Sequence, residues 1–221
     1  MQKIYIVGGN GFARECYLYL LWMSHANPEI QFAGFLGHGG YGHTVDYKNL
    51  QDFYKGEVKD HAFNIDEYVV IGAGYPELRR KIYEELKARQ VQFFNLIAPY
   101  VYINPTVEIG EANVFVAPFS PGPNIKIGNC NVINGGVVMG HDVEIGNFNF
   151  LGPRCQILGG AIVGNDNQIG AGSVLLPGSK MGNNNKLAPL SALYKGCKND
   201  CYMQGNPALK VGELGDTRNR N

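Results

Sequence analysis

A six-residue repeat runs through the second half of the chain and constrains its fold more than any other feature. Stepping by six from Ile97 to Leu193 gives seventeen positions, and all but Pro121 carry a large apolar residue. In a chain that is 45% hydrophobic, chance would fill roughly half of them. The positions are Ile97, Ile103, Ile109, Phe115, Pro121, Ile127, Ile133, Met139, Ile145, Leu151, Ile157, Val163, Ile169, Leu175, Met181, Leu187 and Leu193. One regular architecture must therefore extend over this whole region.

The residues around each apolar position indicate a short strand followed by a turn. Glycine often comes directly after the apolar residue, and small, β-branched or asparagine residues come four positions after it. A helix with 3.6 residues per turn cannot keep a six-residue repeat on one face. A strand can point the apolar residue inward while glycine or asparagine takes the turn. Stacked coils about 4.8 Å apart would bury one continuous core. The repeat thus predicts a β-helix over residues 97–211.

Residues 1–96 carry no such repeat and indicate a small α/β domain. Strand patterns occupy residues 3–7, 31–36 and 68–71, and helical patterns occupy residues 12–23 and 77–88. A strand, a glycine turn, a helix and a second strand open a doubly wound, Rossmann-like parallel sheet. No element is predicted between Gly37 and Asp66, and residues 212–221 are expected to form a disordered tail.

The glycine turn of this domain is Gly8-Gly9-Asn10-Gly11, followed by Phe12. The dinucleotide fingerprint G-x-G-x-x-G would place its third glycine at Arg14, and no acidic residue follows the second strand, so the pattern disfavours NAD. Two interpretations stay open. The turn serves chain geometry alone, or the backbone N–H groups of Gly8 to Phe12 bind a phosphate-bearing acceptor.

Charge and cysteine content exclude several classes of partner and site. Lys plus Arg and Asp plus Glu each number 19, so no net charge attracts nucleic acid or an anionic membrane. No apolar run is long enough to cross a bilayer, and the N-terminus lacks a signal-peptide pattern. The five cysteines form no Cys-x-x-Cys pair. We therefore expect a cytoplasmic protein with reduced thiols.

His141 is the one histidine of the repeat region, and Asp142 follows it. One histidine per chain is too few for a zinc site of the carbonic-anhydrase type, so no metal is expected. A histidine near neutrality can accept a proton from an attacking amine or hydroxyl when a neighbour fixes its tautomer. Adjacent residues on a strand point to opposite faces, so the Asp142 carboxylate can orient the imidazole only at a corner. A histidine without chemistry is the alternative.

Four segments carry a resemblance to a known family, spread over nearly the whole chain. They are Gly8 to Glu15 (GGNGFARE), Phe94 to Pro99 (FNLIAP), His141 to Gly146 (HDVEIG) and Gly205 to Ala208 (GNPA). In these the chain resembles the sialic-acid O-acetyltransferase and bacillosamine N-acetyltransferase family of bacterial sugar acyltransferases. The resemblance implies a left-handed parallel β-helix with three hexads per coil behind the small α/β domain. It also implies a homotrimer with the acyl donor bound between neighbouring β-helices.

The resemblance implies as well that His141 is the general base and that acetyl-CoA is the co-substrate. We expect an N-acetyltransferase that acts directly on a nucleotide-linked amino sugar. With eighteen residues per coil, Gly159 would lie above His141 and let the thioester approach the backbone, near an N–H donor for the oxyanion. Pro177 and Lys195 follow in the same column and would lie along the pantetheine arm of acetyl-CoA.

Departures from the family pattern keep alternatives open, among them Gly37 and His38 where acids are common after the second strand. Phe12 and Phe150 stand where the family usually has histidine. An O-acetyltransferase of a sialic-acid-like sugar is the nearest alternative, because no residue separates amine from hydroxyl acceptors. A catalytically lapsed scaffold that only binds sugar nucleotides is the other.

Overall fold

The computed structural model describes residues 1–39 and 50–214, which form two compact units. The first unit comprises Met1–Pro99 with Glu111–Val114, and the second comprises Tyr100–Gly110 and the chain from Phe115 onward. The first unit thus extends to Pro99 instead of ending at residue 96, and it includes a short segment from within the repeat region.

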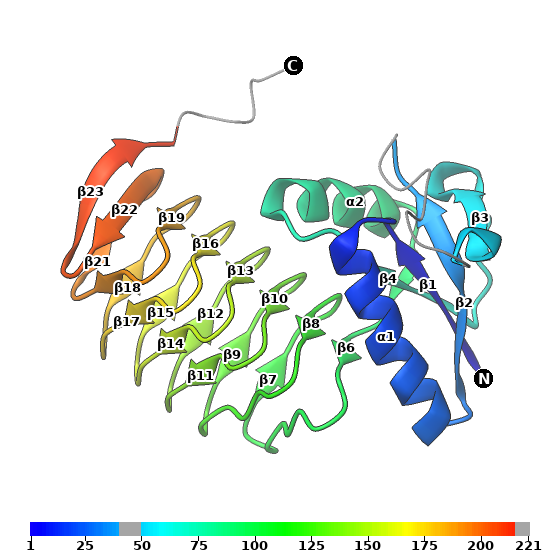
Figure 1. The fold of residues 1–221 in the computed structure, drawn as a ribbon, viewed down its shortest axis with the longest axis horizontal. Helices are drawn as coiled ribbons and strands as arrows, with labels where there is room; N and C mark the ends of the chain where they lie inside the picture. Colours follow the sequence, from blue (N-terminus) through cyan, green and yellow to red (C-terminus); the bar gives the residue numbers. More distant parts are fainter. Residues whose placement is uncertain (40–49, 215–221) are drawn as a thin grey trace. The chain divides into compact units, whose positions relative to one another are not determined.

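The first unit contains a five-stranded parallel sheet in the order β3-β2-β1-β4-β5 (Figure 1). Its elements are β1 (Gln2–Val7), α1 (Gly11–Ala26), β2 (Ile30–Gly37), β3 (Tyr54–Glu57), β4 (Glu67–Ile71), α2 (Pro76–Ala88), β5 (Gln92–Phe93) and β6 (Leu96–Ile97), with 3₁₀ turns at Gln51–Phe53 and Val58–Asp60. The predicted doubly wound sheet is confirmed. The edge strand β3 lies in the stretch where the sequence predicted none, and residues 40–49 of that stretch lie outside the described residues.

The strand order positions the glycine turn. The chain moves outward from β1 to β2 and β3 and then returns to β4 on the other side of β1. The strand order therefore reverses between β1 and β4, and ligands of open α/β sheets bind at the carboxyl ends of strands beside such a reversal. Gly8 to Gly11 leave β1 at this edge, above a core that includes Ile4, Ile6 and Phe35.

The second unit is the predicted β-helix, built mainly of two-residue strands in stacked coils (Figure 1). The strands are β7 (Glu108–Ile109), β8 (Val114–Phe115), β9 (Lys126–Ile127), β10 (Val132–Ile133), β11 (Val138–Met139), β12 (Glu144–Ile145), β13 (Phe150–Leu151), β14 (Gln156–Ile157), β15 (Ile162–Val163), β16 (Gln168–Ile169), β17 (Val174–Leu175), β18 (Lys180–Met181), β19 (Lys186–Leu187), β20 (Ala192–Leu193), β21 (Gly196–Cys197), β22 (Cys201–Gly205) and β23 (Ala208–Glu213). Every hexad position from Phe115 to Leu193 is buried, so the six-residue repeat defines the core.

The turns of this β-helix differ from the expectation in one respect. The left-handed residue lies three positions after the apolar one, as at Asp142 and Phe148, each with φ +57°. The glycine directly after the apolar residue has another role. A Cβ at Gly128 would lie 2.7 Å from the carbonyl oxygen of Gly146 in the next coil. Glycine recurs there because the coils stack too closely for a side chain.

Asparagine side chains connect the coils along one corner. Four of them, Asn131, Asn149, Asn167 and Asn185, are fully buried. Along this inner row each backbone N–H donates to the Oδ1 of the asparagine one coil earlier, for example Asn149 to Asn131 at 2.8 Å. In a second, more exposed row the N–H donates to the following coil, for example Asn165 to Asn183 at 2.7 Å. The two rows satisfy corner N–H groups that no strand pairs.

The regular repeat ends after Leu193. Up to that point strands pair at a spacing of eighteen residues, as Leu175 does with Leu193, but Met181 pairs with Cys197 only sixteen residues on. An antiparallel hairpin of β22 and β23 follows. Gly212 and Glu213 belong to β23, so the tail expected from residue 212 begins too early, and residues 215–221 lie outside the described residues.

Removing one inner asparagine should destabilise the β-helix. Asn149→Ala removes an Oδ1 that accepts from both the N–H and the Nδ2 of Asn167, at 2.9 and 3.0 Å. These donors are buried, so we expect a loss of about 2 kcal/mol or more, measured by urea unfolding. Asn183→Ala is the matched control. It removes the same two bonds to Asn165, but in an exposed position where water replaces them. Equal losses in the two variants would contradict burial as the cause.

Candidate functional site

His141 and Asp142 form a hydrogen-bonded pair at the corner between β11 and β12. The Nδ1 of His141 lies 2.7 Å from Oδ2 of Asp142. Asp142 has φ +57°, and its N–H donates to the carbonyl oxygen of Pro123 at 3.0 Å. This left-handed conformation brings together two adjacent side chains that a strand would separate. The corner that the sequence analysis required for this contact is therefore present.

The pair is exposed to solvent, and its hydrogen bond stabilises the charged form of the Asp142 carboxylate. The side chains of His141 and Asp142 are 67% and 58% exposed. Two hydrogen bonds lower the pKa of the Asp142 carboxyl group below its usual value. The one from His141 contributes most, and the one from Asn124 comes second. A carboxylate that keeps its charge holds a proton on Nδ1 and leaves Nε2 free to accept one. The pair therefore has the geometry of an oriented general base.

Gly159 lies against the imidazole, one coil beyond His141. The N–H of Gly160 donates to the carbonyl oxygen of His141 at 2.9 Å. A Cβ at Gly159 would lie 2.7 Å from Nε2 and 2.9 Å from Cε1 of the ring. Only glycine leaves room for the ring in this position. Within the described part of the chain, the Gly159 N–H has no hydrogen-bond partner.

The other two predicted members of this column are placed differently. Gly178 N–H donates to Gly159 O at 3.0 Å, so Pro177 continues the column and is exposed. Lys195 does not. Lys180 pairs with Gly196, which aligns Lys195 with Ser179, because the coil is two residues shorter here. The expected column of Gly159, Pro177 and Lys195 is therefore wrong at its last member.

The predicted turn of the first unit lies at the carboxyl edge of its sheet. Gly8 has φ +127°, and a Cβ there would lie 3.1 Å from the carbonyl oxygen of Gly72 after β4. Asn10 precedes α1 without capping it through its side chain, and Phe12 is half-buried. The N–H of Gly8 donates to the carbonyl oxygen of Leu36 at 2.9 Å, so it is not available to an anion as the sequence predicted. Among the described residues, the N–H groups of residues 11–13 at the start of α1 have no partner. Unpaired N–H groups at a helix start can bind an anion.

Polar residues that the sequence did not single out gather where β2 and β3 end. His38 is buried, and its Nε2 lies 2.8 Å from Oε2 of Glu85 on α2. Glu57 accepts from the N–H of Gly39 at 3.1 Å and from the hydroxyl of Tyr54 at 3.0 Å. The contacts of His38 with Glu85 and of Gly39 with Glu57 join residues 47 and 18 positions apart, and no spacing rule connects them.

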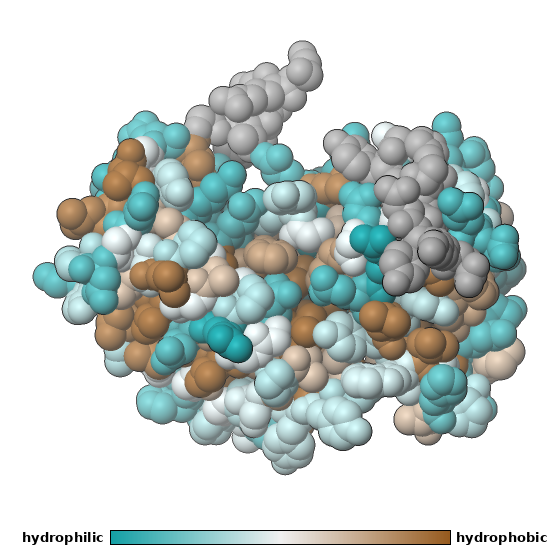
Figure 2. Space-filling model, in the orientation of Figure 1, coloured by the Kyte–Doolittle hydropathy of each residue, from teal (hydrophilic) through white to brown (hydrophobic). Residues whose placement is uncertain are grey.

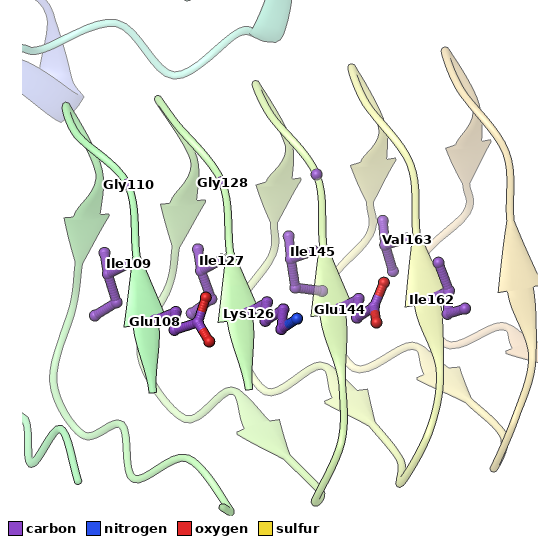
Figure 3. Close-up of a pocket in the computed structure, with 11 residues that line it drawn as sticks. Glu108, Ile109, Gly110, Lys126, Ile127, Gly128, Glu144, Ile145, Ile162 and Val163 are labelled. Atoms are coloured by element: carbon purple, nitrogen blue, oxygen red, sulfur yellow. The ribbon is translucent and has the colours of Figure 1, made fainter. Parts of the chain in front are cut away.

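The face that follows the His141 corner carries an open groove (Figure 3). Glu108, Lys126, Glu144 and Ile162 point outward from successive strands, while Ile109, Ile127, Ile145 and Val163 point into the core (Figure 3). Glutamate and lysine alternate along the first three strands, which favours pairing across neighbouring strands.

Within residues 1–39 and 50–214, no group of three His, Cys, Asp or Glu side chains is arranged to hold a metal ion. In the same residues, no helix combines the length and apolarity needed to cross a membrane.

The sequence matches one family model over part of its length. Residues 142–177 match the model described as bacterial transferase hexapeptide (six repeats). No curated protein sequence matches the chain.

Three solved structures share the fold over both units. The acetyltransferase domain of PglB from Neisseria gonorrhoeae FA1090, in complex with acetyl coenzyme A, is 17% identical with a TM-score of 0.81, covering 95% of this chain and 99% of its own. PerB from Caulobacter crescentus, in complex with CoA and GDP-perosamine, is 21% identical with a TM-score of 0.80, covering 96% and 98%. WeeI from Acinetobacter baumannii AYE is 21% identical with a TM-score of 0.82, covering 96% and 100%. The α/β domain followed by a left-handed β-helix, expected from the resemblance, is confirmed.

Replacing the histidine should change the titration of its partner. In His141→Ala the Asp142 carboxylate loses the hydrogen bond that contributes most to its lowered pKa, so we expect that pKa to rise toward its usual value. Carbon NMR of the carboxyl group measures it. Asp66, whose pKa is lowered by Lys3, is an internal control that should not move. An unchanged Asp142 pKa would show that the pair does not form in solution.

Proposed function

We propose that the protein is an acetyl-CoA-dependent N-acetyltransferase of a nucleotide-linked amino sugar. The observation that carries this proposal is the His141–Asp142 pair, held at a β-helix corner with its ring against Gly159. The shared fold of two neighbours supports it, since one is in complex with acetyl coenzyme A and another with CoA and GDP-perosamine.

The proposed chemistry is direct transfer. The acceptor amine attacks the thioester carbonyl, and Nε2 of His141 takes a proton from the amine as the C–N bond forms. The tetrahedral intermediate then expels the CoA thiolate, which receives the proton from Nε2 as the C–S bond breaks. Asp142 keeps the other ring nitrogen protonated throughout, so Nε2 faces the reacting atoms in its basic form.

The Gly159 N–H is the proposed donor to the oxyanion of this intermediate. Gly159 lies beside the ring and its N–H has no partner in the described residues, which is what an oxyanion donor requires. The pantetheine arm would then follow the same corner past Pro177. Lys195 aligns with Ser179 instead, so we assign the arm no contact with it.

The acceptor is proposed to bind at the glycine turn of the first unit. The turn Gly8-Gly9-Asn10-Gly11 would hold the diphosphate at the start of α1. The backbone N–H groups there, including that of Phe12, would donate to its oxygens. Use of acetyl-CoA and a sugar nucleotide favours a cytoplasmic enzyme.

The first test is calorimetric titration with acetyl-CoA and with UDP-, GDP- and dTDP-linked amino sugars, followed by assay of CoA release. We expect saturable binding of acetyl-CoA and of one sugar nucleotide, and a loss of turnover of about 100-fold or more in His141→Ala. Turnover within a few-fold of wild type in that variant would overturn the mechanism. Transfer to a hydroxyl would identify an O-acetyltransferase, and absence of acetyl-CoA binding would identify a lapsed scaffold.

We also propose a homotrimer with acetyl-CoA between neighbouring β-helices. Polar and apolar residues are interspersed over the face shown in Figure 2. In the second unit, Val138 and Leu190 are 51% and 80% exposed, and burial of such residues stabilises an interface.

Sedimentation equilibrium tests this assembly. We expect a mass of three chains over the micromolar range, because an interface that builds the donor site should persist at working concentrations. A mass of one chain would contradict the trimer.

A further inference from the structure

Asp142 has a second hydrogen-bond partner one coil earlier. The Nδ2 of Asn124 donates to Oδ1 of Asp142 at 3.2 Å, while the His141 ring occupies Oδ2 at 2.7 Å. Asn124 and Asp142 are eighteen residues apart, and both have φ +57°. The two residues therefore occupy the same corner of successive coils.

The contact continues into the coil before that. The N–H of Asn124 donates to Oγ1 of Thr106 at 2.8 Å, and that hydroxyl donates to Oδ1 of Asn104 at 2.6 Å. Asn104 is fixed in turn, because its Nδ2 lies 3.1 Å from the carbonyl oxygen of Pro121 and 3.0 Å from that of Gly122. A relay of Asn104, Thr106, Asn124 and Asp142 thus runs along one corner to His141.

The relay fixes the rotation of the Asp142 carboxylate, which an exposed side chain would otherwise leave free. The Asp142 side chain is 58% exposed, so packing alone does not fix its rotation. One hydrogen bond on each oxygen selects one orientation of the carboxylate, and that orientation aims Oδ2 at Nδ1 of His141. A precisely oriented partner fixes the tautomer of a catalytic histidine and the direction of its free nitrogen.

We propose that Asn124, braced by Thr106, is a positioning residue that orients Asp142 and through it the base His141. The inference rests on the proposed acetyl transfer for its catalytic meaning. Its structural content, an oriented carboxylate and a fixed histidine tautomer, can be measured without any substrate.

Asn124→Gly is the appropriate variant. Asn124 has φ +57°, where glycine is unstrained, and Gly160 and Gly178 already occupy this corner in later coils with φ +68°. The substitution therefore removes the amide without straining the backbone. Asn184→Gly is the matched control, since Asn184 has φ +52° and its Nδ2 donates to Asp200 Oδ1 at 2.6 Å along a different corner.

Three readouts test the proposal. In Asn124→Gly we expect kcat to fall about 10-fold with little change in KM, because orientation of the base and not binding is lost. We expect the pKa of the Asp142 carboxyl group to rise, because one donor to its charged form is gone. Nitrogen NMR should show the His141 ring as a mixture of tautomers. Asn184→Gly should change none of the three.

An Asp142 pKa and a His141 tautomer both unchanged in Asn124→Gly would overturn the positioning role, whatever the turnover. Altered NMR readouts with unchanged kcat would overturn its catalytic meaning. Failure of the wild type to transfer acetyl to any acceptor would instead overturn the proposed function, and the NMR readouts would still decide whether the relay orients the pair.

Thr106 provides a second, independent variant. Thr106→Val removes the hydroxyl that accepts from the Asn124 N–H, so it should shift the same readouts in the same direction but less. Thr106→Ser keeps a hydroxyl and should restore them. An effect of equal size in both Thr106 variants would indicate a packing role and contradict the relay.

Discussion

The close stacking of coils at a fixed repeat is the constraint on which the second unit depends. Backbone hydrogen bonds join strands of neighbouring coils in a register of eighteen residues, so that Ile145 lies beside Val163 and the N–H of Gly146 donates to the carbonyl oxygen of Val163. This spacing leaves no room for a Cβ at Gly128 or Gly146. It also leaves N–H groups at the corners without strand partners, and the asparagine rows satisfy them. Burial of the hexad residues supplies the stabilising free energy, while glycine and asparagine make the close approach possible.

The candidate site uses the same constraint. A left-handed residue occurs at every corner from Asn124 to Leu190, and at Asp142 it brings the carboxylate against the preceding histidine. The coil above contributes Gly159, whose missing side chain leaves space for the ring. The coil below contributes Asn124. The imidazole is thus oriented by three successive coils although it is mostly exposed, and this orientation comes from side-chain hydrogen bonds between corner residues and not from burial.

The hexad pattern predicted the β-helix because burial of one residue in six can be read directly from a sequence. The same register placed Gly159 one coil beyond His141, whereas the contact of Asp142 with His141 was predicted only on the condition of a corner between them. Lys195 was misplaced because the coil shortens by two residues, and the pattern contains no signal for that change. Asn124 was missed although it lies one coil before Asp142, since asparagine at a corner also has a purely conformational role. His38 and Glu85 meet only through the packing of α2, which no local pattern encodes.

Because residues of three successive coils meet at one corner, a change in the length of the chain between them affects the site. Inserting a single hexad between Asn124 and His141 would keep every apolar residue pointing inward, and the core would remain intact. It would nevertheless rotate all later corners by a third of a turn about the helix axis, so Asp142 would no longer lie over Asn124. The apolar core therefore tolerates length changes in steps of six residues, whereas the relay and the asparagine rows tolerate only whole coils of eighteen. The site therefore depends on the angular position of its residues around the β-helix axis, and not on how many residues the β-helix contains.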